Sequence, residues 1–140
     1  MALPNGAGGY QLGDGNLTEV QIRTQATPAT ATVTATLTTA QILNGILLGT
    51  PTTTAAAYTL PLCTDLDAAV PSAKNNSCFD FTVINTNGSG GGVITITTNT
   101  GWTLVGDMDF SANSGATTKS AGRLRARKTG TGAWTIYRLS

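Results

Sequence analysis

Histidine is absent from the 140 residues of this chain, and its absence removes a large part of enzyme chemistry. Histidine is the side chain most often used as a general base near neutral pH, and it is the commonest metal ligand. Catalytic triads built on histidine are therefore excluded. A cysteine nucleophile would need an activating partner, and the only basic residue close in sequence to Cys63 or Cys78 is Lys74. We predict a protein that is not an enzyme and that needs no cofactor.

Charge is also scarce, because charged residues make up 11% of the sequence, whereas ordinary globular domains contain about a quarter. The formal net charge is +1, so no strong field would gather a polyanion or an anionic membrane. We therefore expect neither nucleic acid nor membrane as a partner. No charged residue stands between Arg23 and Asp65, which predicts that part of this stretch faces protein rather than water.

Cysteine is limited to Cys63 and Cys78. The N-terminus lacks the basic start and apolar core of a signal peptide, and no apolar run approaches the roughly 20 residues that span a bilayer. We therefore expect synthesis in a cytosol and a protein that stays soluble. That compartment favours two reduced thiols, with a disulfide between them as the alternative. The length suits one domain.

The chain begins with a glycine-rich segment, residues 1–28, whose apolar residues follow neither a helical nor a strand period. Such a segment is predicted to be an extended arm that takes its order from a partner. A floppy terminus is the alternative. Against that alternative stand spaced apolar residues that a solvated tail would not need, namely Tyr10, Leu12, Leu17, Val20 and Ile22.

Residues 29–140 read as a body built mainly of β-strands. Residues 29–37 alternate Ala, Val or Leu with Thr, which predicts one strand with a small apolar face. Residues 40–48 follow a Thr that can cap a helix, have apolar residues at helical spacing and end before Gly49 and Pro51. These signals predict one short helix. A strand with a bulge is the alternative, because Gly45 disfavours a helix. A strand at residues 55–60 and a helical turn at residues 64–70 are expected next.

The C-terminal half gives the clearest strand signals. Residues 79–85 alternate large apolar side chains, and a glycine-rich hairpin tip at residues 88–92 leads into a strand at 93–98. A further strand is predicted at residues 102–105, and a final hairpin pairs residues 121–128 with residues 133–139. Several short strands separated by Gly and Asn turns are typical of a sandwich or a barrel.

Candidate binding groups are few. Asp65 with Asp67, and Asp107 with Asp109, are spaced like Ca²⁺ ligands but lack the rest of an EF-hand loop, so we interpret them as solvated turn carboxylates and predict no metal site. Period-2 spacing on a strand places three arginines on one face. They are predicted either to form a solvated face or to bind carboxylates of a partner through forked donors: Arg123, Arg125 and Arg127.

Motifs along nearly the whole chain resemble the decoration (cement) proteins of tailed-bacteriophage heads. They are residues 8–16 (GGYQLGDGN), residues 37–45 (LTTAQILNG), Gly49-Thr50-Pro51, residues 58–61 (YTLP), residues 79–85 (FDFTVIN) and residues 132–139 (GAWTIYRL). The resemblance implies a mainly β, jelly-roll-like β-sandwich with one short helix and an extended N-terminal arm. It implies a homotrimer on the exterior of the virion capsid, made in the host cytoplasm, that binds the major capsid protein and ties neighbouring capsomers together.

In this interpretation residues 1–28 are the capsid-binding arm and residues 29–140 are the trimerisation and decoration domain. A trimeric fibre-tip or carbohydrate-binding β domain for host attachment is the alternative. Such a domain would expose aromatic rings for sugar stacking, and its candidates are Tyr58, Trp102 and Trp134.

Overall fold

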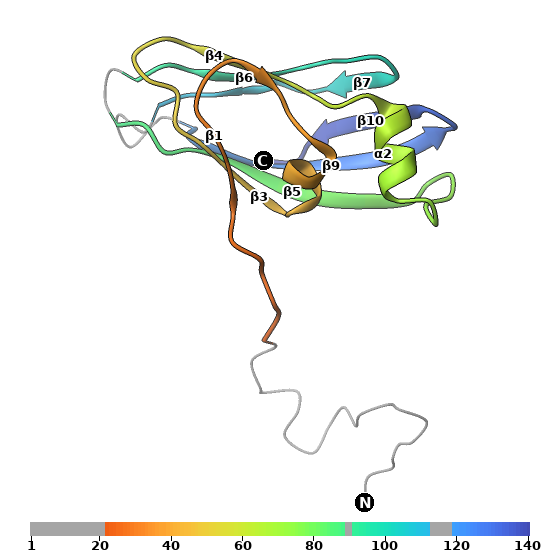
Figure 1. The fold of residues 1–140 in the computed structure, drawn as a ribbon. Coiled ribbons are helices and arrows are strands. Elements are labelled where there is room, and N and C mark those ends of the chain that lie inside the picture. The colour runs from red at the N-terminus through yellow and green to blue at the C-terminus, as the bar shows by residue number, and fades with distance from the viewer. Residues whose placement is uncertain (1–21, 89–90, 113–118) are drawn as a thin grey trace, which may run out of the picture.

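Two mixed β-sheets face each other in the body of the molecule (Figure 1). The structure is a computed structural model that describes residues 22–88, 91–112 and 119–140. The six-stranded sheet has the order β1 (Ala29–Ala31), β3 (Ile46–Gly49), β5 (Cys78–Asn85), β9 (Ala121–Gly130), β10 (Ala133–Arg138) and β7 (Trp102–Val105). The four-stranded sheet has the order β2 (Ala35–Thr36), β4 (Ala56–Thr59), β6 (Ile94–Thr97) and β8 (Asp109–Phe110). The helices are α1 (Thr39–Leu43) and α2 (Cys63–Ala69).

From β1 to β8 the chain alternates between the two sheets, one strand at a time. As a result β1, β3 and β5 pair in parallel in one sheet, and β2, β4 and β6 pair in parallel in the other. The mainly β prediction is confirmed, but the jelly-roll part is not, because jelly rolls are antiparallel. The predicted hairpin between residues 79–85 and 93–98 is wrong, since β5 and β6 belong to different sheets. The hairpin of β9 and β10 is confirmed.

The single strand predicted for residues 29–37 is also wrong. The chain forms β1, turns at residues 32–34 and enters the other sheet as β2. The corner is held by polar contacts: the N–H of Ala57 donates to Thr34 Oγ1 (3.1 Å), and the Tyr58 hydroxyl donates to the carbonyl of Ala31 (2.8 Å). Alternation of Ala and Thr satisfies a strand in either sheet, so the pattern contained no signal for the corner.

The helix predicted for residues 40–48 is correct at its start and wrong at its end. Thr38 caps α1 with a capping box, because its side chain accepts from the Gln41 N–H while its own N–H donates to Gln41 Oε1. The helix ends at Leu43, and Gly45 adopts a φ of +96°, which turns the chain into β3. Residues 46–49 form the regular strand β3, whose pairings with β1 and β5 contain no register shift. The turn expected at residues 64–70 is the seven-residue helix α2.

The core fills the space between the inner faces of the two sheets. Its largest fully buried side chains are Trp134, Tyr58, Phe81, Phe110, Ile42, Leu47, Leu60, Leu66, Ile94, Ile96, Leu124 and Ile136. Trp134 packs edge-on against Phe79, with ring centroids 5.9 Å apart, and lies 6.4 Å from Trp102. Burial of these apolar surfaces is the main stabilising contribution to such a body.

Among the described residues, one polar side chain is fully buried between the sheets. Asn85, 1% exposed, ends β5, and its amide nitrogen donates to the carbonyls of Gly92 and Phe110, both at 2.9 Å. Its amide oxygen accepts from the Asn87 N–H at 3.1 Å. The side chain therefore ties the end of the six-stranded sheet to the backbone beside β6 and β8, and its amide N–H groups and its oxygen all have partners.

We expect Asn85→Ala to lower the free energy of unfolding by about 2–4 kcal/mol, because two carbonyls and one N–H would lose a buried partner. Urea unfolding followed by circular dichroism measures the change. Asn75→Ala is the control, since Asn75 is exposed, and its stability should stay within about 0.5 kcal/mol of the parent. Equal stability of the two variants would show that this network does not hold the sheets together.

Candidate interaction surface

Strand β9 places the three predicted arginines on the outer face of the six-stranded sheet. Leu124 and Ala126, which alternate with them, are completely buried on the inner face. Neighbouring strands add to the outer face through the register of the sheet, which pairs Arg125 with Asp80 of β5 and with Tyr137 of β10. We use "outer face" below for this side of the six-stranded sheet.

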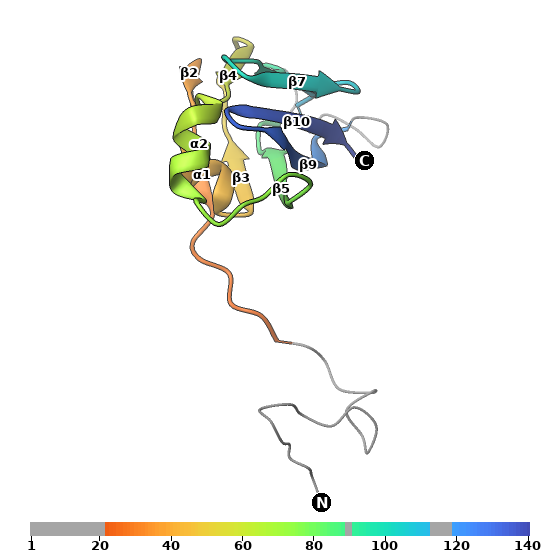
Figure 2. The same ribbon diagram turned by 90° about the vertical axis from the view of Figure 1, so that its right-hand side faces the viewer.

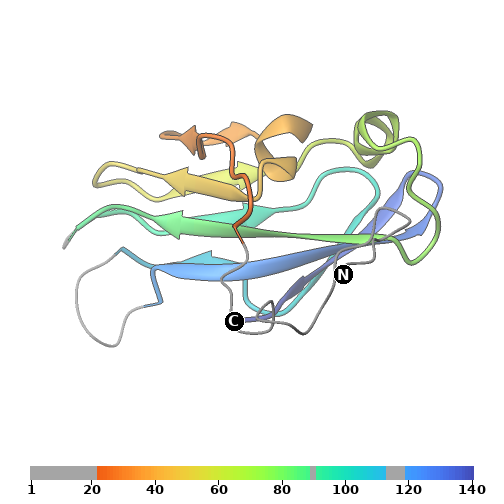
Figure 3. The ribbon, with the colours of Figure 1, turned by 90° about the horizontal axis from the view of Figure 1, so that it is seen from below.

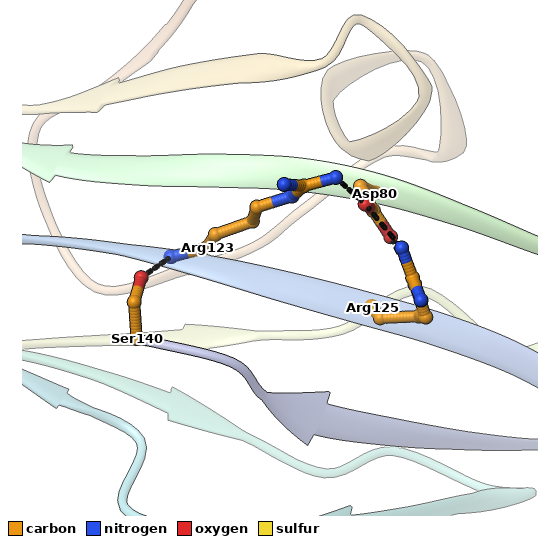
Figure 4. Close-up of polar contacts among 4 residues, drawn as sticks. All are labelled: Asp80, Arg123, Arg125 and Ser140. Carbon is orange, nitrogen blue, oxygen red and sulfur yellow. Dashed lines mark hydrogen bonds and ion pairs between the residues drawn. The ribbon is translucent and has the colours of Figure 1, made fainter.

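Asp80 lies between two of the arginines (Figure 4). Arg125 binds the carboxylate with two atoms, Nε to Oδ1 at 2.6 Å and Nη2 to Oδ2 at 2.9 Å. Arg123 Nη2 also donates to Oδ2, and its backbone N–H donates to Ser140 Oγ at 3.1 Å. The hydrogen bonds from Arg125, followed by those from Arg123, lower the pKa of Asp80 from 3.8 to about 2, although partial burial acts in the opposite direction.

Arg127 has a different environment. Its Nε and Nη2 donate to the amide oxygen of Asn76 at 3.2 and 3.0 Å, and its Nη1 donates to the Tyr137 hydroxyl at 3.0 Å. Among the described residues no carboxylate lies within ion-pair distance of Arg127. Arg123 and Arg125 therefore share one carboxylate, Asp80, whereas Arg127 is held by neutral groups.

Apolar side chains flank this charged cluster. Ile46 and Leu48 of β3 and Ile84 of β5 stand on the outer face and are half-buried, and on the other flank Val105 of β7 is exposed beside Tyr137. The outer face thus combines arginine, tyrosine and aliphatic side chains, a composition typical of protein interfaces.

The described part of the arm, residues 22–28, is extended chain. It leaves the body on the side of the six-stranded sheet, away from β4 and β6, as two perpendicular views show (Figures 1 and 2). Gln25 Nε2 donates to the Asn44 carbonyl, and Asn44 Nδ2 donates to the Thr27 carbonyl, both at 2.9 Å. Ile22 is 94% exposed. The other apolar candidates of the arm, Tyr10, Leu12, Leu17 and Val20, lie outside the described residues.

The acidic pairs have roles that differ from each other. Asp107 and Asp109 are exposed, and Asp109 Oδ1 accepts from Thr95 Oγ1 at 2.6 Å. Within the described ranges, no three Cys, Asp or Glu side chains gather as metal ligands would. Asp65 is exposed, but the interpretation of Asp67 as a solvated turn carboxylate is wrong.

Asp67 projects from α2 onto the end of the β9–β10 hairpin. Its oxygens accept from the Gly132 N–H (2.7 Å) and Trp134 Nε1 (2.8 Å), and Lys128 Nζ lies 2.9 Å from Oδ1. The Gly132 N–H is the main cause that lowers the pKa of Asp67, with Lys128 and Trp134 adding to it against partial burial. Sequence reasoning missed this cluster. One sequence signal pointed to it. Lys128 follows Leu124 and Ala126 on the inner face of its strand, where a charged side chain needs a partner.

Both cysteines are free thiols. Cys63 is buried in the core, and burial raises the pKa of its thiol to about 11. Cys78 is exposed at the start of β5, on the outer face, where it pairs with Arg127 of β9. The structure thus contains no disulfide between Cys63 and Cys78.

The aromatic residues proposed for sugar stacking do not reach the surface. Tyr58 and Trp134 are fully buried, and Trp102 is 7% exposed with its Nε1 donating to the Pro61 carbonyl at 2.6 Å. The expectation that they are exposed is wrong, because each ring fills the core and its polar atom binds inside the protein. They therefore give no support to the carbohydrate-binding alternative.

The helices of the described residues are too short and too polar to cross a membrane. Compared with known proteins, the chain matches no family model, no curated protein and no solved structure.

We expect Asp67→Asn to destabilise the protein by about 2–4 kcal/mol, because Lys128 would keep a largely buried ammonium group without its carboxylate. Thermal and urea unfolding measure this loss. Asp65→Asn, two residues earlier on the exposed side of α2, is the matched control and should change stability by less than about 0.5 kcal/mol. If the two variants were equally stable, the ion pair would contribute nothing measurable.

The pKa of Asp80 predicts the direction of an acid effect. Because the pKa is lowered in the folded state, its contribution to stability is complete above pH 3.8 and is lost as the pH falls toward about 2. The melting temperature should therefore decrease between about pH 4 and pH 2. In Asp80→Asn this decrease should be smaller, since the titrating group is gone. Parallel curves for the two proteins would contradict the assignment.

Proposed function

We propose that this chain is a structural, non-catalytic virion protein that binds the outside of a bacteriophage head as a trimer and cements neighbouring capsomers. Its partner is the major capsid protein. The two-sheet body takes the place that a jelly-roll subunit has in such trimers, and residues 1–28 act as the strap. The motifs that resemble head decoration proteins support this proposal, and residues 24–64, which carry no charge, suit a chain that is partly covered by protein.

The observation that carries the proposal is the extended, exposed segment 22–28 leaving a well-packed β body. A strap would gain apolar contact between Ile22, which is exposed on this segment, and the surface that it crosses. The hydrogen bonds of Gln25 and Thr27 with Asn44 fix the point from which the arm leaves.

Trimerisation would turn weak contacts into firm attachment. Three arms on one trimer meet a symmetric shell together, so the second and third bind at a high effective concentration. Binding that exists only on the assembled shell stabilises that shell by linkage.

The test uses expanded empty heads of the phage that encodes the chain, in co-sedimentation with the purified protein. Deleting residues 1–28 should leave a folded trimer, shown by circular dichroism and light scattering, that no longer sediments with heads. A second variant keeps the length of the arm but replaces Tyr10, Leu12, Leu17, Val20 and Ile22 with Ser, and it should also fail to bind.

If both variants still bind heads, the proposal that residues 1–28 act as a strap is wrong. A full-length protein that is monomeric and does not bind heads would remove the proposed function as a whole.

A further inference from the structure

The outer face carries an excess of positive charge that the described residues do not neutralise. Asp80 is the one carboxylate among three guanidinium groups, so the cluster has a net charge of +2, from Arg123, Arg125 and Arg127 at +3 and Asp80 at −1. The Arg123 and Arg125 side chains stay 56% and 43% exposed despite their contacts with Asp80. Their remaining N–H donors are available to acceptors on another molecule.

The geometry of these arginines favours carboxylates as the acceptors. Asp80 holds Arg125 by two bonds, so the guanidinium planes are preorganised on a sheet rather than free in solution. Planar forked donors of this kind bind carboxylates by paired hydrogen bonds. The half-buried Ile84 and the Tyr137 ring beside them supply the apolar contact that a stable protein interface needs.

The opposite side of the body has a different chemistry. On the outer face of the four-stranded sheet the hydroxyls of Thr59 and Thr97 bind each other at 3.0 Å, and Thr95 binds Asp109. These polar groups satisfy one another, and no arginine lies on β2, β4, β6 or β8. That side is suited to water.

The arm leaves the body on the side of the outer face. Seen from below, residues 22–28 stand in front of the six-stranded sheet (Figure 3), and the hydrogen bonds to Asn44 fix this exit beside the start of β3. A surface that faces residues 22–28 therefore lies opposite the arginines and not opposite the threonines of the other sheet.

We propose that the outer face of the six-stranded sheet docks on a carboxylate-bearing surface of the capsid shell, so that the arm and the arginines bind the same partner. The inference rests on the proposed function and adds the face that meets the shell and the chemistry of the surface that it meets. The four-stranded sheet then points to solvent.

The first test removes charge from the outer face and leaves the Arg125–Asp80 pair in place. Arg123→Ala combined with Arg127→Ala should weaken binding to empty heads by about tenfold or more and reduce its dependence on salt concentration. Lys74→Ala combined with Lys119→Ala removes the same charge from exposed loop positions and should change binding by less than about twofold. Thermal unfolding checks that all variants are folded. Equal weakening by the two pairs would mean a general charge effect and would overturn the proposal.

A second measurement uses Cys78 as a native probe. It is exposed next to Arg127, whereas Cys63 is buried with a raised pKa, so N-ethylmaleimide should modify Cys78 selectively. On heads, the modification rate of Cys78 should fall about tenfold or more, read by mass spectrometry, because a docked face excludes the reagent. In the control, Cys78→Ser with Thr36→Cys places the thiol on the outer face of the four-stranded sheet, and its rate should not change on binding.

The outcomes separate this inference from the proposed function. If the full-length protein binds heads, the arginine variant binds equally well and Cys78 stays reactive, then docking by the outer face is wrong. The proposed binding by the arm is unaffected by that result. If Cys78 is already protected in the free trimer, the outer face is a contact between copies and the proposal is overturned. If the full-length protein does not bind heads, both are wrong.

Discussion

The structure depends on how the chain satisfies its backbone at the corners where it passes from one sheet to the other. A strand that leaves a ladder exposes N–H and C=O groups that need new partners. Asn85 provides them at the end of β5, and the Tyr58 hydroxyl and Thr34 provide them near β1 and β2. Because side chains perform this role inside the body, the outer faces of the sheets are left free for other contacts.

The two outer faces have separate characters as a result. Polar groups on the four-stranded sheet are paired with one another. The six-stranded sheet presents three arginines, two of them bound to Asp80, that are flanked by aliphatic side chains. The outer face that carries the arginines and the described residues 22–28 of the arm lie on the same side of the molecule. The difference between the two outer faces thus follows from the side chains that alternate to the outside along each strand.

Features set by neighbouring residues were predictable from the sequence. The β9–β10 hairpin, the shared face of the three arginines and the Thr38 cap all depend on local patterns. Features set by distant residues were not. Alternation in residues 79–85 and 93–98 defines two strands but cannot say that they join different sheets, and the acidic Asp67 gives no sign that Lys128 and Trp134 will meet it. Gly45 did indicate that the helix predicted for residues 40–48 could be interrupted, and its positive φ ends α1.

The attachment of the arm has a mechanical consequence. Strand β1 is only three residues long and lies at the edge of its sheet, so tension applied to the arm would peel it away one residue at a time if it were the first element to take the load. Asn44 stands ahead of it, joined to Gln25 and Thr27, and it is continuous with α1 and with β3, which is paired on both sides. Force on the arm is therefore transmitted to β3 in the interior of the sheet. The body should resist unfolding under this force better than the length of β1 would suggest.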